Sequence, residues 1–286
     1  MTARPGGGWP GPSTTLVGVI GDPVEHSLSP LLHNTAFAEL GLDWASTGFR
    51  VPPGGAAGAL EGARSLGLAG LSVTMPHKAA VAALVDERTG VAARLEAVNC
   101  VIRRGDRLVG DNTDGEGFVV SLRRGVGFEP AGRRCLVLGA GGAARAVVLA
   151  LADAGAAEVV VVNRSAERAS RAAALAGPAG RVGEGGDAVG ADLVVNATPA
   201  GMAGGPAPGE RPAVDPAALG PGQVVADLVY HPIETPWLAA ARSSGATTLG
   251  GLGMLVHQAA AQLLAWTGEE PPLASMWSAA SGALDG

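Results

Sequence analysis

The sequence predicts an α/β protein of two domains, and three observations lead to this expectation. The chain has 286 residues, enough for two hydrophobic cores at roughly 100 to 200 residues per domain. Short apolar runs alternate with helix-like stretches along its length, which is the order of a mainly parallel sheet. A glycine-rich turn near the middle opens a second set of such units. We therefore expect two α/β domains, each built on its own sheet.

Turn and cap signals mark the elements of the first half. The strand at 16–20 ends at Gly21, and the next helix opens with Ser29 as its expected N-cap and Pro30 at its first position. A hairpin turn is expected at 104–106. The elements expected in order are a strand at 16–20, a helix at 29–40, a strand at 44–51, a helix at 56–66, a strand at 70–75, a helix at 77–85, strands at 98–103 and 107–110, and a helix at 115–124.

The second half begins at Arg134 and repeats the same alternation. Its first three elements form a βαβ unit, whose crossover is expected to be right-handed. The elements expected are strands at 135–138, 158–162, 192–196, 224–228 and 247–249, and helices at 143–154 and 254–266. The stretch at 201–212 is rich in glycine and proline, which predicts a mobile loop.

Composition narrows the class of partner. The net charge is -6 and no basic run is present, which argues against nucleic acid or an anionic membrane surface as a partner. Apolar runs fall short of the roughly 18 residues of a membrane span. Cys100 and Cys135 stand apart from any Cys/His cluster, so we expect neither disulfides nor structural zinc, as in a reducing cytoplasm. Residues 1–13 lack the apolar core of a secretory signal and are expected to form a disordered tail.

The basic residues have an unusual composition. They number 20, and Lys78 is the only lysine among them. A lysine ammonium is compact and can lose its proton, whereas a guanidinium cannot, so a retained lysine can mark a site of proton transfer. The alternative is that one surface lysine has survived by chance. Composition alone leaves both interpretations open.

A glycine-rich motif lies between the first strand and helix of the second half. Residues 139–144 read Gly-Ala-Gly-Gly-Ala-Ala and fit G-x-G-x-x-A. Gly139 permits the tight turn, Gly141 allows backbone to approach a pyrophosphate, and Ala144 allows close packing of helix on strand. The alternative is an ordinary glycine-rich turn. The order of strand, motif and helix favours a dinucleotide site.

The end of the second strand distinguishes between nicotinamide cofactors. An NAD site has Asp or Glu there to bind the ribose 2′-hydroxyl. This chain has Asn163 and Arg164 instead, with Arg168 one helical turn later. Two guanidinium groups suit a 2′-phosphate, so we expect NADP. The alternative is a solvated arginine pair at the start of a helix.

Polar residues of the first half gather in short segments at expected strand ends. In an open α/β sheet such positions face a crevice, and hydroxyl, amide and carboxylate groups there suit a small polyhydroxylated ligand. Ser29 and Asp114 can instead cap the helices that they precede. The segments are 21–30 with His33 and Asn34, 72–78, 97–99, and 111–115.

These segments form a set of motifs in a fixed order from about Leu16 to Gln262. They are Gly-Asp-Pro-Val-Glu-His-Ser-Leu-Ser-Pro at 21–30, Ser-Val-Thr-Met-Pro-His-Lys at 72–78, Ala-Val-Asn at 97–99, Asn-Thr-Asp-Gly at 112–115, the glycine-rich turn with Asn-Arg-Ser at 163–165, Asn-Ala-Thr-Pro-Ala-Gly-Met at 196–202, and Gln258. The set resembles that of the shikimate dehydrogenase family. Ser72 departs from the pattern, because the family usually has Asn there.

The resemblance implies NADP-linked interconversion of 3-dehydroshikimate and shikimate, a step toward aromatic amino acids. It implies that Lys78 and Asp114 form the catalytic pair. The substrate-binding residues that it implies are Ser27, Ser29, Thr74, Lys78, Asn99, Asp114, Tyr230 and Gln258. The cofactor-binding residues are Gly139, Ala140, Gly141, Gly142, Ala143, Asn163, Arg164, Arg168, Leu228 and Gly251. Ketone reduction needs a proton donor near the developing alkoxide, a role that lysine can fill and arginine cannot.

The expected organisation follows from these assignments. A substrate-binding domain would comprise 14–115 with 252–286 returning to it, and a Rossmann-type NADP-binding domain 116–251, with the active site in the cleft between them. We expect a monomer or homodimer. The histidines are not spaced as a metal-ligand set, hydride transfer needs no metal, and His77 is expected at the surface.

Other functions stay open at this point. A quinate/shikimate dehydrogenase of the same family usually prefers NAD, which Arg164 and Arg168 do not favour. A non-catalytic NADP-binding sensor would need no Lys78/Asp114 pair. A folate-linked methylene dehydrogenase also uses a lysine, but its aromatic substrate does not suit these hydroxyl and amide segments.

Overall fold

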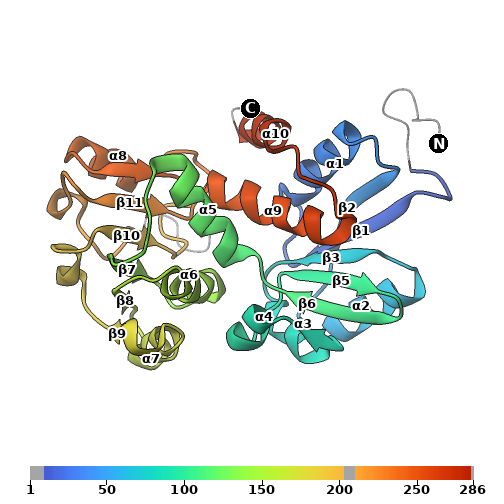
Figure 1. Ribbon diagram of the computed structural model, residues 1–286, viewed down its shortest axis with the longest axis horizontal. Coiled ribbons are helices and arrows are strands. Elements are labelled where there is room, and N and C mark those ends of the chain that lie inside the picture. The colour runs from blue at the N-terminus through green and yellow to red at the C-terminus, as the bar shows by residue number, and fades with distance from the viewer. Residues whose placement is uncertain (1–9, 203–209, 285–286) are drawn as a thin grey trace. The chain divides into compact units, whose positions relative to one another are not determined.

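The computed structural model describes residues 10–202 and 210–284, and the chain divides into two compact units (Figure 1). The first unit comprises the chain up to Thr113 together with the segment from Gln258, and the second unit is Asp114–His257. The division falls inside α9 (Leu252–Thr267), a continuous helix that carries the chain from the second unit into the first. The predicted domain bounds, 115/116 and 251/252, place the second crossing at the start of this helix instead.

Two predicted irregular segments lie partly outside the described residues. Of the expected disordered tail, residues 1–9 are outside, whereas 11–14 form a turn in which the Thr14 N–H donates to the Gly11 carbonyl at 3.1 Å. The Thr14 hydroxyl donates to Asp43 Oδ1 at 2.7 Å. Of the expected mobile loop at 201–212, residues 203–209 are outside.

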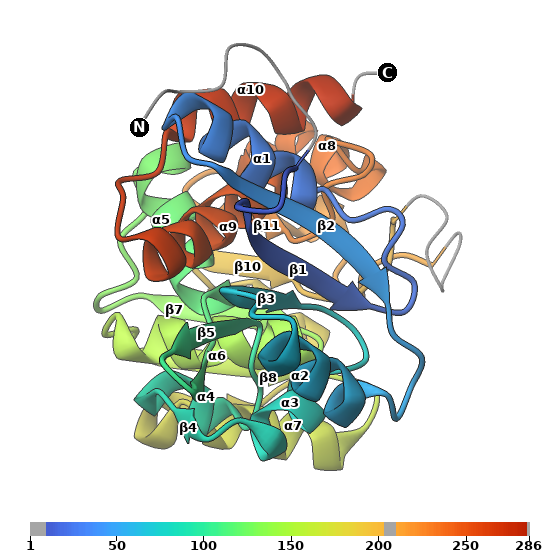
Figure 2. The same ribbon diagram turned by 90° about the vertical axis from the view of Figure 1, so that its right-hand side faces the viewer.

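The sheet of the first unit is mixed. Its strands are β1 (Thr15–Gly21), β2 (Trp44–Arg50), β3 (Gly70–Val73), β4 (Glu87–Arg88), β5 (Cys100–Arg104) and β6 (Arg107–Asp111), in the spatial order β2-β1-β3-β5-β6-β4. β1 runs parallel to both β2 and β3, and Figure 2 shows these three strands side by side. β5 is antiparallel to β3 and to β6, which confirms the hairpin that the turn residues predict.

Helices flank this sheet and bury its apolar face. They are α1 (Ser29–Glu39), α2 (Ala56–Ser65), α3 (Lys78–Leu84), α4 (Gly90–Leu95), the second part of α9, and α10 (Leu273–Leu284), which packs on α1. One core cluster joins Ile20 and Val73 of the sheet to Leu60 of α2 and Val81 of α3. This core fixes where β1 and β3 end, and therefore where the polar segments begin.

The second unit has a fully parallel sheet. Its strands are β7 (Arg134–Leu138), β8 (Glu158–Val162), β9 (Gly180–Val182), β10 (Leu193–Asn196), β11 (Val224–Asp227) and β12 (Thr247–Leu249). Their spatial order is β12-β11-β10-β7-β8-β9, the doubly wound order of a Rossmann fold. The order reverses between β7 and β10, so the crevice at which ligands bind such sheets lies at their carboxyl ends.

Apolar side chains cover both faces of this sheet. The helices are α5 (Asp114–Val126), α6 (Gly142–Asp153), α7 (Ala166–Ala174), α8 (Pro236–Ser243) and the first part of α9. Val137 and Val161 belong to the cluster that includes α6, while Leu136 and Val160 belong to the cluster that includes α8. Consecutive strand residues thus point to opposite cores, and the predicted pair of α/β domains is confirmed. Within the described residues, none of the helices combines the length and apolar character required to traverse a membrane.

Candidate functional site

The polar segments of the first unit meet at one end of its sheet, where the strands β1 and β3 finish. The carboxyl ends of the parallel strands β1 and β3 lie there, and the antiparallel β5 brings the segment that precedes it to the same place. The backbone hydrogen bonds that join the segments are Thr74 N–H to Ile20 O, Asp22 N–H to Met75 O and Val98 N–H to Lys78 O, each at 2.9 Å, and Asn99 N–H to Asp111 O at 3.0 Å. Segments that are far apart in the sequence are therefore neighbours here.

Lys78 is the first residue of α3, and its side chain is half-buried. A turn precedes it, in which the His77 N–H donates to the Thr74 carbonyl at 3.0 Å. Thr74 is also half-buried, and a Cβ on Gly21 would overlap its methyl group. The glycine at the end of β1 therefore allows Thr74 and the strand end to approach closely.

His77 is buried, so the expectation of a surface position was wrong. Only 1% of the residue is exposed, and its Nε2 lies 2.7 Å from the Val51 carbonyl oxygen. A carbonyl oxygen can only accept, so Nε2 carries the hydrogen in this contact. The bond ties the start of α3 to the end of β2, and His77 thereby supports the backbone next to Lys78.

Asn99 is held rigidly at the centre of the converging segments. It is 1% exposed, its Oδ1 accepts from the Thr113 N–H at 2.8 Å, and its Nδ2 donates to the Thr113 hydroxyl at 3.0 Å. The Thr113 hydroxyl lies 3.1 Å from the Gln258 carbonyl oxygen. Thr113, the threonine of the Asn-Thr-Asp-Gly motif, therefore links Asn99 to α9.

Ser27 and Ser29 lie at the entrance to α1. Ser29 is buried and Ser27 half-buried, and the Ser29 N–H donates to the Ser27 hydroxyl at 3.3 Å. The expectation that Ser29 is the N-cap was wrong, because Leu28 holds that position and no side chain caps the helix. The Leu32 N–H donates to the Leu28 carbonyl, so Ser29 is the first residue of the helix and not its cap. The Ser29 hydroxyl is not used in capping.

Asp114 begins α5 in the second unit and is 6% exposed. A carboxylate in the first turn is favoured by the positive end of the helix dipole. Gly115 follows it, and a Cβ there would come within 2.7 Å of the Ala146 carbonyl oxygen. Close packing of α5 on α6 thus fixes the backbone at Asp114, while its pairing with Lys78 stays a prediction.

The glycine-rich turn has the geometry that a dinucleotide phosphate needs. Gly139 has φ +112°, and a Cβ there would meet the Ala197 carbonyl oxygen at 2.9 Å. Gly141 is the N-cap of α6, and a Cβ on Gly141 or Gly142 would meet nothing within 4 Å. Between them, Ala140 is half-buried, and Ala143 follows in the first turn of α6. The N-terminus of α6 is therefore open, with backbone N–H groups available to an anion.

The residues after β8 present two cations to solvent. Ser165 caps α7 by accepting from the Arg168 N–H at 3.3 Å, and the Asn163 Nδ2 donates to the Ser165 carbonyl at 3.1 Å. Arg164 is 92% exposed, with Glu210 at 3.9 Å, and Arg168 is exposed too. The backbone here is ordered while both guanidinium groups remain accessible.

A buried hydrogen-bond cluster supports the ends of β10 and β11. Asp227 is 1% exposed and accepts from Asn196 Nδ2 and the Thr235 hydroxyl, each at 2.8 Å. Burial raises the pKa of this carboxyl, while its hydrogen bonds act in the opposite direction. Sequence reasoning did not identify Asp227, although an acidic residue ending an apolar strand is a recognisable signal.

Leu228 and Gly251 are in direct contact within the second unit. The Gly251 N–H donates to the Val229 carbonyl at 3.2 Å, and a Cβ on Gly251 would overlap the Leu228 carbonyl. Tyr230 is half-buried close by in the chain, and burial raises the pKa of its phenol. The chain thus leaves β11 along a path that only glycine at 251 permits.

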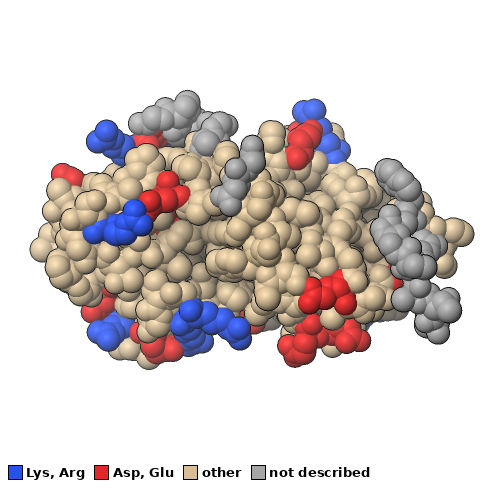
Figure 3. All heavy atoms as spheres, turned by 90° about the horizontal axis from the view of Figure 1, so that it is seen from above, with Lys and Arg blue, Asp and Glu red and all other residues tan. Residues whose placement is uncertain are grey.

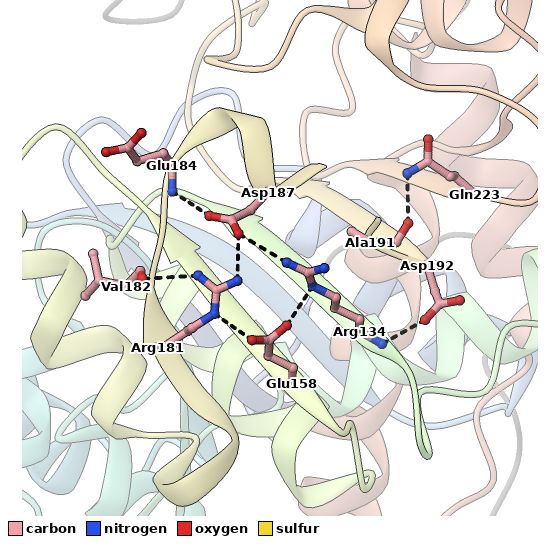
Figure 4. A network of polar contacts seen from close by, with 9 residues as sticks. All are labelled: Arg134, Glu158, Arg181, Val182, Glu184, Asp187, Ala191, Asp192 and Gln223. Carbon is pink, nitrogen blue, oxygen red and sulfur yellow. Dashed lines mark hydrogen bonds and ion pairs between the residues drawn. The ribbon is translucent and has the colours of Figure 1, made fainter. Parts of the chain in front are cut away.

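An ionic network lies where β7 and β8 begin and on the neighbouring strand β9, at the end of the parallel sheet away from the glycine-rich turn (Figure 4). Arg181 donates to Glu158 at 2.5 Å and to Asp187 at 2.6 Å, and Arg134 contacts the same two carboxylates at 2.6 and 3.1 Å. Arg181 lowers the pKa of Asp187 to about 2. Each guanidinium is matched by carboxylates, so this network fastens the strands and leaves no spare cation for a ligand.

The surface charges and the arrangement of possible metal ligands complete the description of the charged groups. On the face in Figure 3, basic side chains of the described residues stand in small separate groups, several of them beside acidic ones. Among the described residues, no three His, Cys, Asp or Glu side chains are arranged to hold a metal ion.

Comparison with family models covers most of the chain. The substrate binding domain of shikimate dehydrogenase matches residues 19–101. The shikimate / quinate 5-dehydrogenase family matches 125–182, and the shikimate 5′-dehydrogenase C-terminal domain matches 251–280. These matches fall in both units.

Full-length relatives and solved structures agree with these matches. The shikimate dehydrogenase (NADP(+)) of Moorella thermoacetica is 48% identical over 274 residues, 92% of each chain. A crystal structure of a shikimate dehydrogenase in complex with NADP+ superposes with a TM-score of 0.92 at 35% identity, covering 98% of this chain and 99% of the other. The shikimate 5-dehydrogenase of Thermus thermophilus, in complex with NADP(H) and shikimate, has a TM-score of 0.85 at 37% identity, with coverage of 95% and 100%.

Proposed function

This chain belongs to the shikimate dehydrogenase family, and we propose that it catalyses the reversible, NADP-dependent reduction of 3-dehydroshikimate to shikimate on the route to aromatic amino acids. The observation that carries the proposal is the convergence of the polar segments around Lys78 and Asn99 at one sheet edge of the first unit. Amide, hydroxyl and ammonium groups gathered in this way suit a small polyhydroxylated carboxylate. The chain is an oxidoreductase acting on a CH–OH group.

The cofactor is NADP, and the second unit has the groups to hold it. The open N-terminus of α6, from Gly139 to Ala143, would bind the pyrophosphate through backbone N–H groups. Arg164 and Arg168, with Asn163, would bind the adenosine 2′-phosphate, and their exposure supports this role. Leu228 and Gly251 would lie beside the nicotinamide, which supplies or accepts the hydride when it is bound.

The substrate is held by residues from several elements. We assign its hydroxyl and carboxylate contacts to Ser27, Ser29, Thr74, Asn99, Tyr230 and Gln258, together with the catalytic pair. The Ser29 hydroxyl caps no helix, which supports a role in ligand binding. The buried bonds to Thr113 hold the Asn99 amide in a single orientation, so its geometry is set before substrate binds.

Lys78 acts on the reacting oxygen. As the substrate carbonyl becomes an alkoxide, the Lys78 ammonium donates a hydrogen bond and then a proton to it, and in the reverse direction the amine takes that proton back. Asp114 orients the ammonium and a substrate hydroxyl. His77, bonded to the Val51 carbonyl, keeps the first turn of α3 in place beneath Lys78.

Initial rates with four substrate pairs test this function. We expect the purified chain to oxidise shikimate with NADP far faster than shikimate with NAD, or quinate with either cofactor. A clear preference for quinate with NAD would replace the proposal by a quinate/shikimate dehydrogenase. Absence of any turnover would favour an NADP-binding sensor.

Variants at Lys78 test the catalytic assignment. Lys78→Ala should lose roughly 10³-fold or more in kcat while still binding shikimate, because positioning by the remaining contacts persists. Lys78→Arg keeps the charge but not a usable proton, and we expect it to be nearly as inactive. An active Lys78→Arg enzyme would refute proton transfer by this residue.

The cellular setting is also proposed. We infer a cytoplasmic enzyme whose partner is this small substrate, without nucleic acid or membrane, as a monomer or homodimer. Cys100 and Cys135 are both free and buried, and burial raises the pKa of Cys135 to about 12, which keeps its thiol unreactive. Light scattering on the purified chain would give the oligomeric state.

A further inference from the structure

A second glutamine on α9 lies directly behind the proposed substrate site. Gln262 is fully buried, one helical turn after Gln258. Its Nε2 lies 3.1 Å from the Asn99 carbonyl oxygen and 3.1 Å from Gln258 Oε1. Gln262 therefore touches both Asn99 and Gln258, two residues that we assign to substrate binding.

These contacts determine which way the Gln262 amide faces. A backbone carbonyl can only accept, so the group facing the Asn99 carbonyl must be the NH₂ of Gln262. The same carbonyl accepts from the Val73 N–H at 2.8 Å, which uses its second lone pair. The Gln262 amide is thus oriented by the edge of the sheet.

The orientation of Gln262 in turn determines that of Gln258. One hydrogen of the Gln262 NH₂ goes to Asn99, and the other points to the Gln258 side chain, which must offer an acceptor there. The Gln258 Oε1 meets that need, so its Nε2 lies on the side of the amide turned away from Gln262. Toward other groups, Gln258 consequently presents N–H donors.

The far side of Gln262 is consistent with this arrangement. Its Oε1 and the Nε2 of His33 are both buried, and within the described residues neither makes a regular hydrogen bond. The His33 Nδ1 lies 3.2 Å from the Ser46 hydroxyl, which can donate to it and leave the hydrogen on Nε2. The Gln262 side chain interacts with the His33 ring in the sense that raises the histidine pKa, as an oxygen acceptor does, and reversal of the amide would set two donors against each other.

We propose that Gln262 is a positioning residue for substrate binding: it holds Gln258 with its oxygen toward the core, so that Gln258 recognises an oxygen acceptor of the substrate through Nε2. This inference rests on the proposed function, in which Gln258 and Asn99 bind the substrate. Gln262 itself does not contact the substrate. Its effect is to remove the alternative, flipped orientation of Gln258, so that the donor is in place before binding.

The test is a steady-state comparison of Gln262→Met with the wild type. Methionine has similar length and fills the space but cannot donate to Gln258 or Asn99. We expect KM for shikimate to rise about tenfold, the value for losing one well-placed hydrogen bond, with kcat and KM for NADP within about threefold of wild type. Leu263→Val, a buried neighbour on the same helix, is the matched control and should lower Tm without changing KM.

A double-mutant cycle with Gln258→Ala separates positioning from general loosening. If Gln262 acts through Gln258, adding Gln262→Met to Gln258→Ala should change KM for shikimate by less than about twofold. Independent effects that multiply, or an unchanged KM in Gln262→Met, would overturn the proposal. Should Gln262→Met not fold, Gln262→Leu also removes both donors without adding a charge and makes the same prediction. Failure of the proposed function is distinguishable, because the wild type itself would then not oxidise shikimate.

Discussion

The buried His33 makes the stability of the first unit depend on pH. The ring is 0% exposed, packs edge-on against Trp266 with centroids 4.8 Å apart, and contacts the Ser46 hydroxyl. Burial lowers its pKa from 6.5 to about 3, and the smaller contribution of Gln262 acts in the opposite direction. The folded protein thus keeps His33 neutral under conditions in which an unfolded chain would protonate it.

The sign and size of the effect follow from linkage. Between pH 6.5 and about 3 the unfolded chain binds a proton that the folded chain does not, so the free energy of unfolding falls as pH falls. Each pH unit costs about 1.4 kcal/mol, which amounts to about 2 kcal/mol at pH 5 relative to pH 8. Stability is fully retained above pH 6.5, and the full loss is reached near pH 3.

His33→Gln is the variant that isolates the contribution of His33 to the pH dependence of the free energy of unfolding. An amide can still meet Ser46 and Gln262 but does not titrate in this range. Urea unfolding of both proteins at pH 8, 7, 6 and 5 should show the wild type losing about 2 kcal/mol more than the variant between pH 8 and 5. His257, whose pKa is also lowered by burial, is present in both proteins and cancels. A gap between the two proteins that does not change with pH would refute the burial argument.

Three further predictions concern the second unit. Arg168→Ala should raise KM for NADP about tenfold and leave KM for NAD unchanged, whereas Arg171→Ala on the same helix should affect neither, which initial rates with both cofactors would measure. Gly251→Ala should lower the free energy of unfolding by about 1 to 3 kcal/mol and kcat by about tenfold or more, because the added methyl group would displace the Leu228 carbonyl. Urea unfolding and steady-state rates measure the two effects. Asp227→Ala leaves the buried Asn196 amide and Thr235 hydroxyl without this acceptor and should lower the free energy of unfolding by about 2 kcal/mol, again measured by urea unfolding.

Local signals were sufficient for most of the fold. The strands at 158–162 and 247–249 have the predicted bounds, and the hairpin of β5 and β6 formed where its turn residues indicated. The strand at 158–162 is short and rich in β-branched residues, and both features are visible from neighbours in the sequence. The parallel order of the second sheet then follows from the βαβ rule.

The elements that were missed have weak or short patterns. β4 has two residues and β9 three, too few for any period to show. α8 had a usable signal, since Thr235 caps it and Pro236 follows at its first position.

Prediction of the candidate site failed where the decisive contact is distant in sequence. His77 was expected at the surface, yet it is buried against the Val51 carbonyl oxygen, 26 residues away in the sequence. Gln262 lies 163 residues from the Asn99 carbonyl that it contacts. A single sequence does not show which distant residues come into contact. The glycine-rich turn and the arginines after β8, in contrast, were identified from patterns of neighbouring residues.

In the proposed function, the hydrogen bonds that run from the sheet through Gln262 to Gln258 give these distant contacts a role in substrate binding. Recognition of one substrate hydroxyl or carboxylate oxygen requires that a donor, and not an acceptor, face it, and a glutamine amide alone offers either with equal ease. The Asn99 carbonyl removes this ambiguity, because a backbone carbonyl can only accept and therefore faces the NH₂ group of Gln262. The same NH₂ group then requires an acceptor from Gln258 one turn away on α9. The orientation of Gln258, which we propose to bind the substrate, is thus set through two successive hydrogen bonds by the main chain just before β5. Substitutions that leave every substrate contact in place can therefore still weaken binding.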